Sequence, residues 1–331
     1  MLSVIIPTVN EAKAIDALLD QLAHQTGVNL EVIVVDGGST DATPQVVLEK
    51  GAKLLKTQAG RGIQMNQGAE AASGEYLLFL HADSCLTSDR QLASALQEVK
   101  QEEEPVAGHF ALSFATQDRE LKHQLRFFEE KSHLNRPGTW SGDQGLLISR
   151  ATLNLYDGFW QELPFLEDKD FARKFQKTGR FITCNSIIRT SARRFEKEGY
   201  LERVIVNTII MAMFLLDDYH FLNKAFGIYR INGKSNHLDP HPFLKGAKSK
   251  VFKGDTIQVI QRLYKLSRFA IENAWQIALF LGMRKDSVDS YLFVYEKYIK
   301  PWTHNVLCYM IGIPIIIIWI FWKLLKPSYS K

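Results

Sequence analysis

Short apolar runs alternate with amphipathic stretches through the first hundred residues of the chain. Ile15, Leu18, Leu19 and Leu22 fall at i, i+3, i+4 and i+7, which is the spacing of one helical face. Runs rich in β-branched residues flank this helix and recur after it. The strands are expected at residues 3–6, 31–35, 53–55 and 76–80. Strands that alternate with helices predict successive βα units and a largely parallel sheet.

The segments that follow complete this pattern and then leave it. A second helix is expected after Ser39 or Thr40, either of which can cap it, with Pro44 in its first turn. Residues 110–114 alternate between large apolar and small or polar side chains, as in a half-buried strand. A polar stretch with proline and glycine, residues 135–145, comes next. Loops of this kind, positioned by a rigid sheet, often carry function.

The C-terminal third has a different character. Beyond about Tyr200 the chain has long apolar and amphipathic stretches, such as residues 204–216, and a basic, loop-like break at residues 233–253. We therefore expect one α/β domain at residues 1–230 and a helical region at residues 231–331.

One uncharged apolar segment, residues 306–322, lies near the end of this helical region. Its length of about 17 residues is at the short end of what spans a bilayer. Pro314 in its middle would kink a helix. Three interpretations follow: a spanning helix, a re-entrant or interfacial helix, and a buried core helix.

Composition narrows the class of protein. The 331 residues are 46% hydrophobic and 23% charged, which is typical of a folded protein. The net charge of +4 suits an anionic ligand or a membrane surface and does not indicate nucleic-acid binding. Cys85, Cys184 and Cys308 are far apart and have no zinc-binding spacing, so we expect a reducing compartment. The apolar run 2–6 is too short for a signal peptide, which favours the cytoplasm.

Two aspartates follow predicted strands. Asp36 ends an apolar strand and opens a Gly-Gly-Ser-Thr turn, and Asp83 follows the most apolar strand. The carboxyl ends of parallel strands are where open α/β sheets bind ligands. Asp36 would contact a nucleotide base or ribose, or it caps its own turn. His81, just before Asp83, is a candidate metal ligand, a ribose contact or a turn residue.

Further polar residues lie in the loops and helix termini around this edge. Arg61 stands in a glycine-flanked loop where a guanidinium would pair with anionic oxygen, or it is a solvated surface arginine. Glu167 and Asp168 precede a helix and would occupy its first turn, where the helix dipole favours ionised carboxylates. Arg193 and Arg194 offer two guanidiniums for a diphosphate or a phosphorylated acceptor.

Four segments in fixed order resemble family 2 glycosyltransferases of the GT-A fold: residues 4–11, 34–41, 60–83 and 166–168. Two motifs are similar to those of one bacterial branch of this family: Gly-Arg-Gly-Ile-Gln-Met-Asn-Gln-Gly, and after it Leu-Phe-Leu-His-Ala-Asp. The resemblance covers about residues 1–200. It implies a mixed α/β sheet flanked by helices, a nucleotide-sugar donor and a catalytic domain at residues 1–230.

The resemblance also implies roles for individual residues. Asp168 matches the base that deprotonates the acceptor, with Glu167 as its supporting neighbour, and Asp83 matches the ligand of Mg²⁺ or Mn²⁺. Only the last acid of the usual Asp-x-Asp is present, and Gly37 replaces a second acid beside Asp36. The donor would be bound by Pro7, Thr8, Asn10, Glu11, Asp36, Arg61, Asn66 and His81. The loop with Trp140, Asp143 and Gln144 would face the acceptor, where an aromatic surface suits a sugar ring, although a packed tryptophan is the alternative.

We therefore expect an inverting, metal-dependent glycosyltransferase at the cytoplasmic face of the cell membrane, with a lipid or lipid-linked acceptor. Asp36, Asp83 and Asp168 must then converge on one cleft. An inactive membrane-bound nucleotide-sugar-binding protein is one alternative, since the Asp-x-Asp motif is incomplete. A nucleotidyltransferase is another, but it would need a glycine-rich phosphate loop where Pro-Thr-Val-Asn-Glu stands at residues 7–11.

Overall fold

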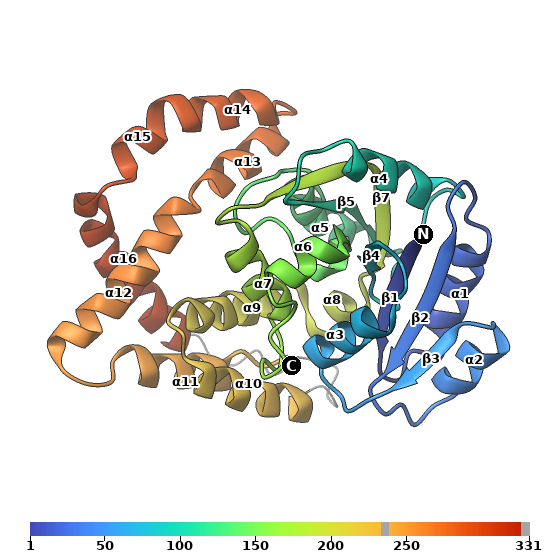
Figure 1. Ribbon diagram of the computed structural model, residues 1–331. Helices are drawn as coiled ribbons and strands as arrows, with labels where there is room; N and C mark the ends of the chain where they lie inside the picture. Colours follow the sequence, from blue (N-terminus) through green and yellow to red (C-terminus); the bar gives the residue numbers. More distant parts are fainter. Residues whose placement is uncertain (233–237, 326–331) are drawn as a thin grey trace. The chain divides into compact units, whose positions relative to one another are not determined.

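The computed structural model describes residues 1–232 and 238–325, and the chain forms two compact units, Met1–Ala192 and Arg193–Lys331 (Figure 1). The division falls earlier than the boundary at residue 230 expected from the sequence. The reason is that the last strand ends at Ser191, after which the chain is helical. The helices at 200–215 and 219–232 pack with those that follow them.

The first unit is built on a mixed seven-stranded sheet in the order β3-β2-β1-β4-β6-β5-β7. Strands β1 to β4 are parallel, β6 is antiparallel to both of its neighbours, and β5 is parallel to β7. The predicted mixed α/β sheet is thus confirmed, together with all four expected N-terminal strands. The strands are β1 (Leu2–Thr8), β2 (Leu30–Asp36), β3 (Lys53–Lys56), β4 (Tyr76–Phe79), β5 (Val106–Ala115), β6 (Leu146–Ser149) and β7 (Arg180–Ser191).

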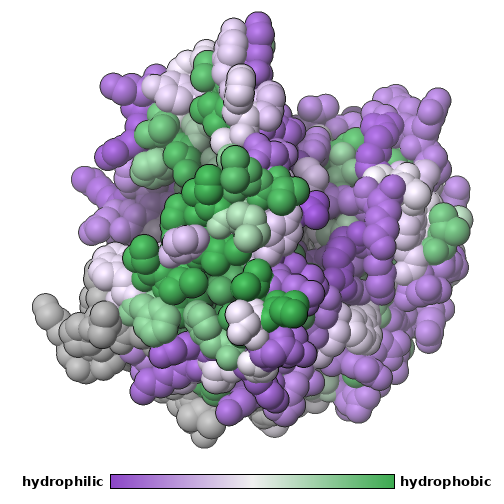
Figure 2. Space-filling view, turned by 90° about the vertical axis from the view of Figure 1, so that its left-hand side faces the viewer, coloured by the Kyte–Doolittle hydropathy of each residue, from purple (hydrophilic) through white to green (hydrophobic). Residues whose placement is uncertain are grey.

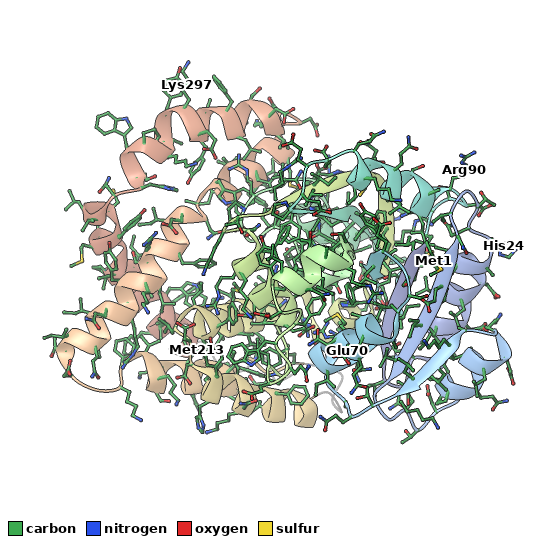
Figure 3. All side chains as sticks on the ribbon, viewed as in Figure 1. Met1, His24, Glu70, Arg90, Met213 and Lys297 are labelled. Atoms are coloured by element: carbon green, nitrogen blue, oxygen red, sulfur yellow. The ribbon has the colours of Figure 1, made fainter. Side chains whose placement is uncertain are left out.

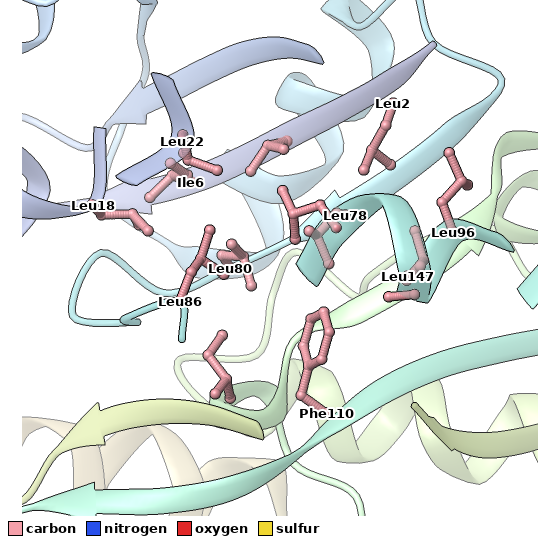
Figure 4. Close-up of a cluster of buried hydrophobic side chains, with 14 of the residues drawn as sticks. Leu2, Ile6, Leu18, Leu22, Leu78, Leu80, Leu86, Leu96, Phe110 and Leu147 are labelled. Atoms are coloured by element: carbon pink, nitrogen blue, oxygen red, sulfur yellow. The ribbon is translucent and has the colours of Figure 1, made fainter. Parts of the chain in front are cut away.

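Helices cover both faces of the sheet. On one face pack α1 (Ala12–Ala23), α2 (Thr43–Glu49) and α4 (Gln91–Lys100), whose leucines and valines meet those of β1, β4 and β6 (Figure 4). On the other face pack α3 (Arg61–Ala71), α6 (Arg150–Leu155) and α7 (Glu167–Phe175). Helix α5 (Arg119–Ser132) lies against β5, and a short 3-10 helix, η1 (Gly142–Gln144), precedes β6.

The local helix predictions are confirmed in α1 and corrected in α2. Ile15, Leu18, Leu19 and Leu22 are all buried, as their spacing predicts. Pro44 does lie in the first turn of α2, but the N-cap is Ala42, without a side-chain hydrogen bond. Ser39 and Thr40 do not cap the helix because both hydrogen-bond to Asn10 across the loop instead.

Strand direction brings several loops to one edge. The carboxyl ends of β1, β2, β3 and β4 meet there because these strands are parallel. The loop before β6 meets the same edge because β6 runs the other way. Helix α3 packs so tightly that a Cβ on Gly68 would lie 2.4 Å from Cγ2 of Ile5. This close approach fixes the start of α3, at Arg61, beside the strand ends.

The second unit is helical. Residues 204–216, predicted to be amphipathic, lie almost wholly in α9, but the loop expected at 233–253 was wrong in part: α11 occupies 241–251, and residues 233–237 are outside the described part. The helices are α8 (Arg193–Glu198), α9 (Tyr200–Leu215), α10 (Tyr219–Asn232), α11 (His241–Val251), α12 (Thr256–Glu272), α13 (Trp275–Arg284), α14 (Val288–Val294), the π-helical turn η2 (Tyr295–Ile299), α15 (Lys300–Thr303) and α16 (Val306–Leu325).

Candidate active site

Arg61, the first residue of α3, is at the centre of a cluster of charged side chains at the sheet edge. Its Nε atom lies 3.0 Å from Oε1 of Glu167, and its Nη1 atom lies 3.3 Å from Nε2 of His81. Nearby carboxylates raise the pKa of the guanidinium, Glu167 most strongly, followed by Asp168, Asp143 and Asp83. The structure therefore brings together Arg61, His81 and four acids from three other parts of the chain: Asp83, Asp143, and the adjacent Glu167 and Asp168.

Glu167 begins α7 and is buried, with only 1% of its surface exposed. Its Oε1 atom pairs with Arg61, whereas Oε2 has no hydrogen-bond partner in the described structure. Burial raises the pKa of this carboxyl, and the positive charge of Arg61 acts against that rise. Leu166 just before it has φ +69°, an unfavourable angle for a residue with a Cβ. The turn is thus held in place by its surroundings, as at many functional sites.

Asp168 is held by two backbone N–H groups. Its Oδ2 atom accepts a hydrogen bond of 2.8 Å from the Gly142 amide, and its Oδ1 atom accepts one of 2.8 Å from Lys169. The side chain is only partly buried, so each oxygen keeps a lone pair for a ligand. A small cavity beside it is lined by Met65, Phe79, Leu80, His81, Trp140, Gly142, Leu146, Phe159, Glu167 and Asp168.

His81 links Arg61 to the loop before β6. Its Nδ1 atom lies 2.8 Å from Oδ1 of Asp143, on the side opposite the Arg61 contact at Nε2. Because a guanidinium can only donate, Nε2 accepts and the ring proton resides on Nδ1, from which it is donated to Asp143. Both nitrogens of His81 are therefore occupied by protein groups. Half of the Asp143 side chain, 50%, is exposed.

Asp83 follows β4 in a turn and is half-buried. Within residues 1–232 and 238–325 its carboxylate makes no hydrogen bond or ion pair, so it is open to a ligand. No group of three His, Cys, Asp or Glu side chains in this described part could hold a metal ion. A hard divalent cation at Asp83 would thus take most of its oxygen ligands from a bound diphosphate and water, which is ordinary for Mg²⁺.

The predicted donor-binding residues at and after the ends of β1 and β2 already have hydrogen-bond partners in the neighbouring loops. Asp36 is buried, and its carboxylate accepts hydrogen bonds from the Gly38 and Ser39 amides, so it does cap its own turn. The side-chain oxygen of Asn10 accepts from the Thr40 amide at 2.8 Å. Pro7 and Thr8 end β1, and the Glu11 amide donates to Thr43 Oγ1. Donor contacts by these residues stay predictions.

Asn66 and Trp140 also have structural partners. The Asn66 amide bonds to both the N–H and the carbonyl of Phe159, at 2.9 and 2.7 Å. Trp140 is 2% exposed, stacks on Phe181 with ring centroids 5.0 Å apart, and donates from Nε1 to the Gly145 carbonyl. Trp140 is therefore a packed core residue, as in the alternative given above, because a buried ring offers no surface to a sugar.

Gln144 and the two C-terminal arginines complete the predicted set. Gln144 is buried, and its Nε2 atom donates to the Ser132 carbonyl at 3.1 Å, so it anchors the loop that carries Gly142 and Asp143. Arg193 and Arg194 belong to the second unit, where they begin α8. Their contact with phosphate stays a prediction.

Two residues of the sequence motifs, Gln64 and Gly37, lie at this edge, and the sequence assigns neither of them a contact. Gln64 is 1% exposed, and its Nε2 atom donates to the carbonyls of Thr8 and Val35, at 3.0 and 2.7 Å. It therefore joins the ends of β1 and β2. A Cβ on Gly37 would lie 2.9 Å from Val9 Cγ2 and 3.1 Å from Gln64 Cδ. The second acid of related turns does not fit here, and the glycine in its place was the visible signal.

A mixed sheet with carboxylates and an arginine at the carboxyl ends of its strands defines an α/β domain of the kind that binds ligands at that edge. The family model described as "Glycosyl transferase family 2" matches residues 3–195, and the chain belongs to this family.

Individual relatives are similar over shorter stretches. A 100-residue segment is 41% identical to the "PGL/p-HBAD biosynthesis glycosyltransferase" of Mycobacterium bovis, and it covers 28% of this chain and 39% of that one. A 107-residue segment is 35% identical to an "Uncharacterized glycosyltransferase" of Haemophilus influenzae, over 30% and 35% of the two chains. The chain thus spans about two fifths or less of these curated relatives.

Solved structures are similar at low sequence identity. A mannosyltransferase from Pyrobaculum calidifontis in complex with GDP-Man and Mn²⁺ gives a TM-score of 0.48 at 19% identity, over 96% of this chain and 87% of that one. S. aureus TarS in complex with UDP-GlcNAc gives 0.48 at 20% identity, over 90% and 91%.

Proposed function

We propose that this chain transfers a sugar from a nucleotide-diphosphate sugar to an acceptor hydroxyl, in a single displacement with inversion at the anomeric carbon. The domain would then be of the GT-A type, in the bacterial branch that its motifs resemble. One observation carries the proposal: Asp168, in the first turn of α7, is oriented by the Gly142 and Lys169 amides beside the Arg61 cluster.

Asp168 is the general base in this proposal. As the acceptor oxygen attacks the anomeric carbon, Asp168 takes the hydroxyl proton, and the bond between that carbon and the donor diphosphate breaks. Attack from the face opposite the leaving group inverts the anomeric configuration. The proton then passes from Asp168 to water. Two fixed N–H donors hold the carboxylate in one orientation, which favours proton transfer in a defined geometry.

The leaving nucleoside diphosphate carries negative charge that must be stabilised. Arg61 can stabilise this charge because its side chain is 38% exposed at the sheet edge, while the buried Glu167 carboxylate pairs with its Nε atom. A divalent cation, when bound, supplies Lewis-acid stabilisation of the same charge. Asp83 would hold it, since its carboxylate has no other partner among the described residues.

The acceptor is proposed to be a lipid or lipid-linked molecule at the cytoplasmic face of the cell membrane. Support comes from the second unit, in which large apolar side chains of α12 to α16 are exposed. An exposed apolar surface of this kind marks a protein or membrane contact.

The test is Asp168→Asn in the full-length protein, assayed for donor hydrolysis and sugar transfer with Mn²⁺ across a panel of nucleotide sugars. We expect turnover to fall by about 10²–10⁴-fold, the usual contribution of a general base, with donor affinity changed by less than about threefold. Asp157→Asn is the matched control, because Asp157 is an exposed aspartate in a turn with φ +58°, which asparagine tolerates.

Retained turnover in Asp168→Asn would refute the base assignment. Donor binding without turnover in the unmodified protein, under all donors tested, would instead indicate the nucleotide-sugar-binding alternative.

A further inference from the structure

The second unit has an excess of positive charge that the whole-chain value conceals. Residues 193–331 contain 21 Lys and Arg against 11 Asp and Glu, a net formal charge of +10, whereas the whole chain has +4. The first unit must therefore be acidic. The positive charge of the helical unit suits its attraction to an anionic surface.

Helix α16 has two faces of different character, although nearly all its side chains are apolar. Tyr309 and Ile320 are each 8% exposed, and Gly312 is also buried. Leu307, Ile311, Ile315 and Ile318 are 59% to 70% exposed, and their spacing of four, four and three residues places them on the opposite side. We call these four residues the apolar face of α16.

The buried side of α16 packs on charged helices of the same unit. Ser267 Oγ of α12 donates to the Tyr309 carbonyl at 2.6 Å. A Cβ on Gly312 would lie 2.1 Å from that hydroxyl, so glycine permits this close packing. Further along, at the edge of this contact, the Lys248 ammonium of α11 lies 4.4 Å from the centre of the Phe321 ring, which is 41% exposed. Helix α16 is therefore docked along most of its length.

This docking bears on how α16 meets a membrane. In length and composition alone, Val306–Lys323 is the one stretch of the described helices that could cross a bilayer, with mean hydropathy 2.1 and 22% of its residues buried. To cross it, α16 would have to leave α12 or carry that helix into the hydrocarbon. Helix α12 bears Arg262, Lys265 and Arg268, and charged groups at that depth are costly.

Exposed aromatic and apolar side chains continue in the segment before α16. Trp302 is 81% exposed, and Phe293 and Tyr298 are 58% and 56% exposed. The Lys297 ammonium lies 5.2 and 5.3 Å from the centres of those two rings, and Lys297 projects outward from the unit (Figure 3). Tryptophan and tyrosine beside lysine are typical of the membrane–water interface. Figure 2 shows apolar side chains gathered in one area with hydrophilic ones around it.

We infer that α16 does not span a bilayer but lies in the plane of an anionic membrane surface, with its apolar face in the lipid and its opposite side on α12. This rests on the proposed membrane attachment but not on the sugar transfer. The partner is a bilayer that contains anionic phospholipid, because the unit is both apolar on one face and strongly basic.

The first test is depth measurement on the full chain bound to vesicles of phosphatidylcholine with phosphatidylserine. Spin labels are placed one at a time at Leu307, Ile311, Ile315 and Ile318, in a background without the three native cysteines. The four positions extend about 16 Å along a helix axis. An interfacial helix gives four similar, shallow depths. A steady change of depth by about that amount would show a spanning helix and overturn the inference.

The second test is vesicle co-sedimentation of Leu307→Asp/Ile311→Asp. The matched control is Leu155→Asp/Leu48→Asp, which changes two leucines of the first unit with 70% and 63% exposure, against 70% and 59% for the test pair. We expect at least a tenfold loss of vesicle affinity in the test pair and no such loss in the control pair. High salt should lower the vesicle affinity of the unmodified protein and of both variants. Equal effects in both pairs would contradict the inference.

Two further measurements separate the alternatives. Asp168→Asn is expected to bind vesicles like the unmodified protein, so failure of the transfer proposal leaves this inference standing. If the unmodified protein is a stable dimer that Leu307→Asp/Ile311→Asp dissociates without any change in vesicle binding, a second copy covers the apolar face and the inference fails.

Discussion

Gly142 offers a way to disturb the orientation of Asp168 without touching its carboxylate. A Cβ at residue 142 would lie 3.0 Å from Nε2 of His81 and 3.6 Å from Oδ2 of Asp168. The first contact is about 0.5 Å shorter than an optimal van der Waals separation. Gly142 has no left-handed φ, so the backbone itself accepts alanine. Gly142→Ala should therefore fold and should strain only this contact.

The strain is expected to fall on the hydrogen bond between the Gly142 amide and Asp168. His81 cannot yield easily because Asp143 and Arg61 hold its two nitrogens. The loop that carries residue 142 would instead move away from His81, which would lengthen the 2.8 Å hydrogen bond from the residue 142 amide to Oδ2 of Asp168. A hydrogen bond to a charged group contributes about 1.5–3 kcal/mol, and each 1.4 kcal/mol is tenfold in rate. We expect kcat to fall about 10- to 100-fold.

The assay is kcat and donor affinity for Gly142→Ala, with thermal unfolding measured alongside. Gly227→Ala is the control, because a Cβ at that helical position meets nothing within 4 Å, and it should not change kcat. In an Asp168→Asn background, Gly142→Ala should cost little more, since its effect runs through Asp168. Wild-type kcat in Gly142→Ala, or full additivity with Asp168→Asn, would refute the reasoning.

Three other perturbations test the electrostatics of the first unit. Glu167→Gln leaves Arg61 without its buried counter-ion; because the arginine is partly exposed we expect a loss of only about 1–2 kcal/mol in chemical unfolding, together with weaker donor binding by calorimetry. Burial lowers the pKa of Lys131 from its ordinary value of 10.5 to about 8. Between pH 8 and pH 10.5 the unfolded state therefore keeps a proton that the folded state has lost, so the free energy of unfolding should rise with pH by up to about 3 kcal/mol. Lys131→Met should remove that rise in denaturant titrations. Removal of divalent cation with EDTA should raise the donor Kd at least about tenfold, since the acids around Arg61 repel a diphosphate; an unchanged Kd by calorimetry would contradict this.

Local patterns made most of the first unit predictable. The apolar face of α1 and the acids in the first turn of α7 depend on spacing within one element, and both are confirmed. Burial of Glu167 and its contact with Arg61 could not be read in this way, because they depend on how α3 and α7 pack on the sheet. The same holds for Asn66, whose amide serves the Phe159 backbone.

In the second unit, the loop expected at residues 233–253 was wrong in part because it rested on amino-acid composition and not on the spacing of apolar residues. The segment around α11 contains lysines and glycine, a composition that predicts a loop. Its Phe243, Leu244 and Val251 are nevertheless buried at helical spacing, so tertiary packing decides the structure. The unit boundary is earlier than expected for a similar reason, since the apolar stretch of α9 packs with later helices.

The contacts of the clustered acids support the proposed choice of base without reference to the family. Glu167 is buried and paired with Arg61, and Asp143 accepts a hydrogen bond from Nδ1 of His81. His81 has both nitrogens occupied, so it has no lone pair ready for an acceptor proton. Asp83 has no partner that fixes its carboxylate, which suits a cation that arrives with the donor. Asp168 is oriented by two neutral N–H groups and is still partly exposed. These contacts support the proposed division of roles, with Asp168 as base and Asp83 as cation ligand.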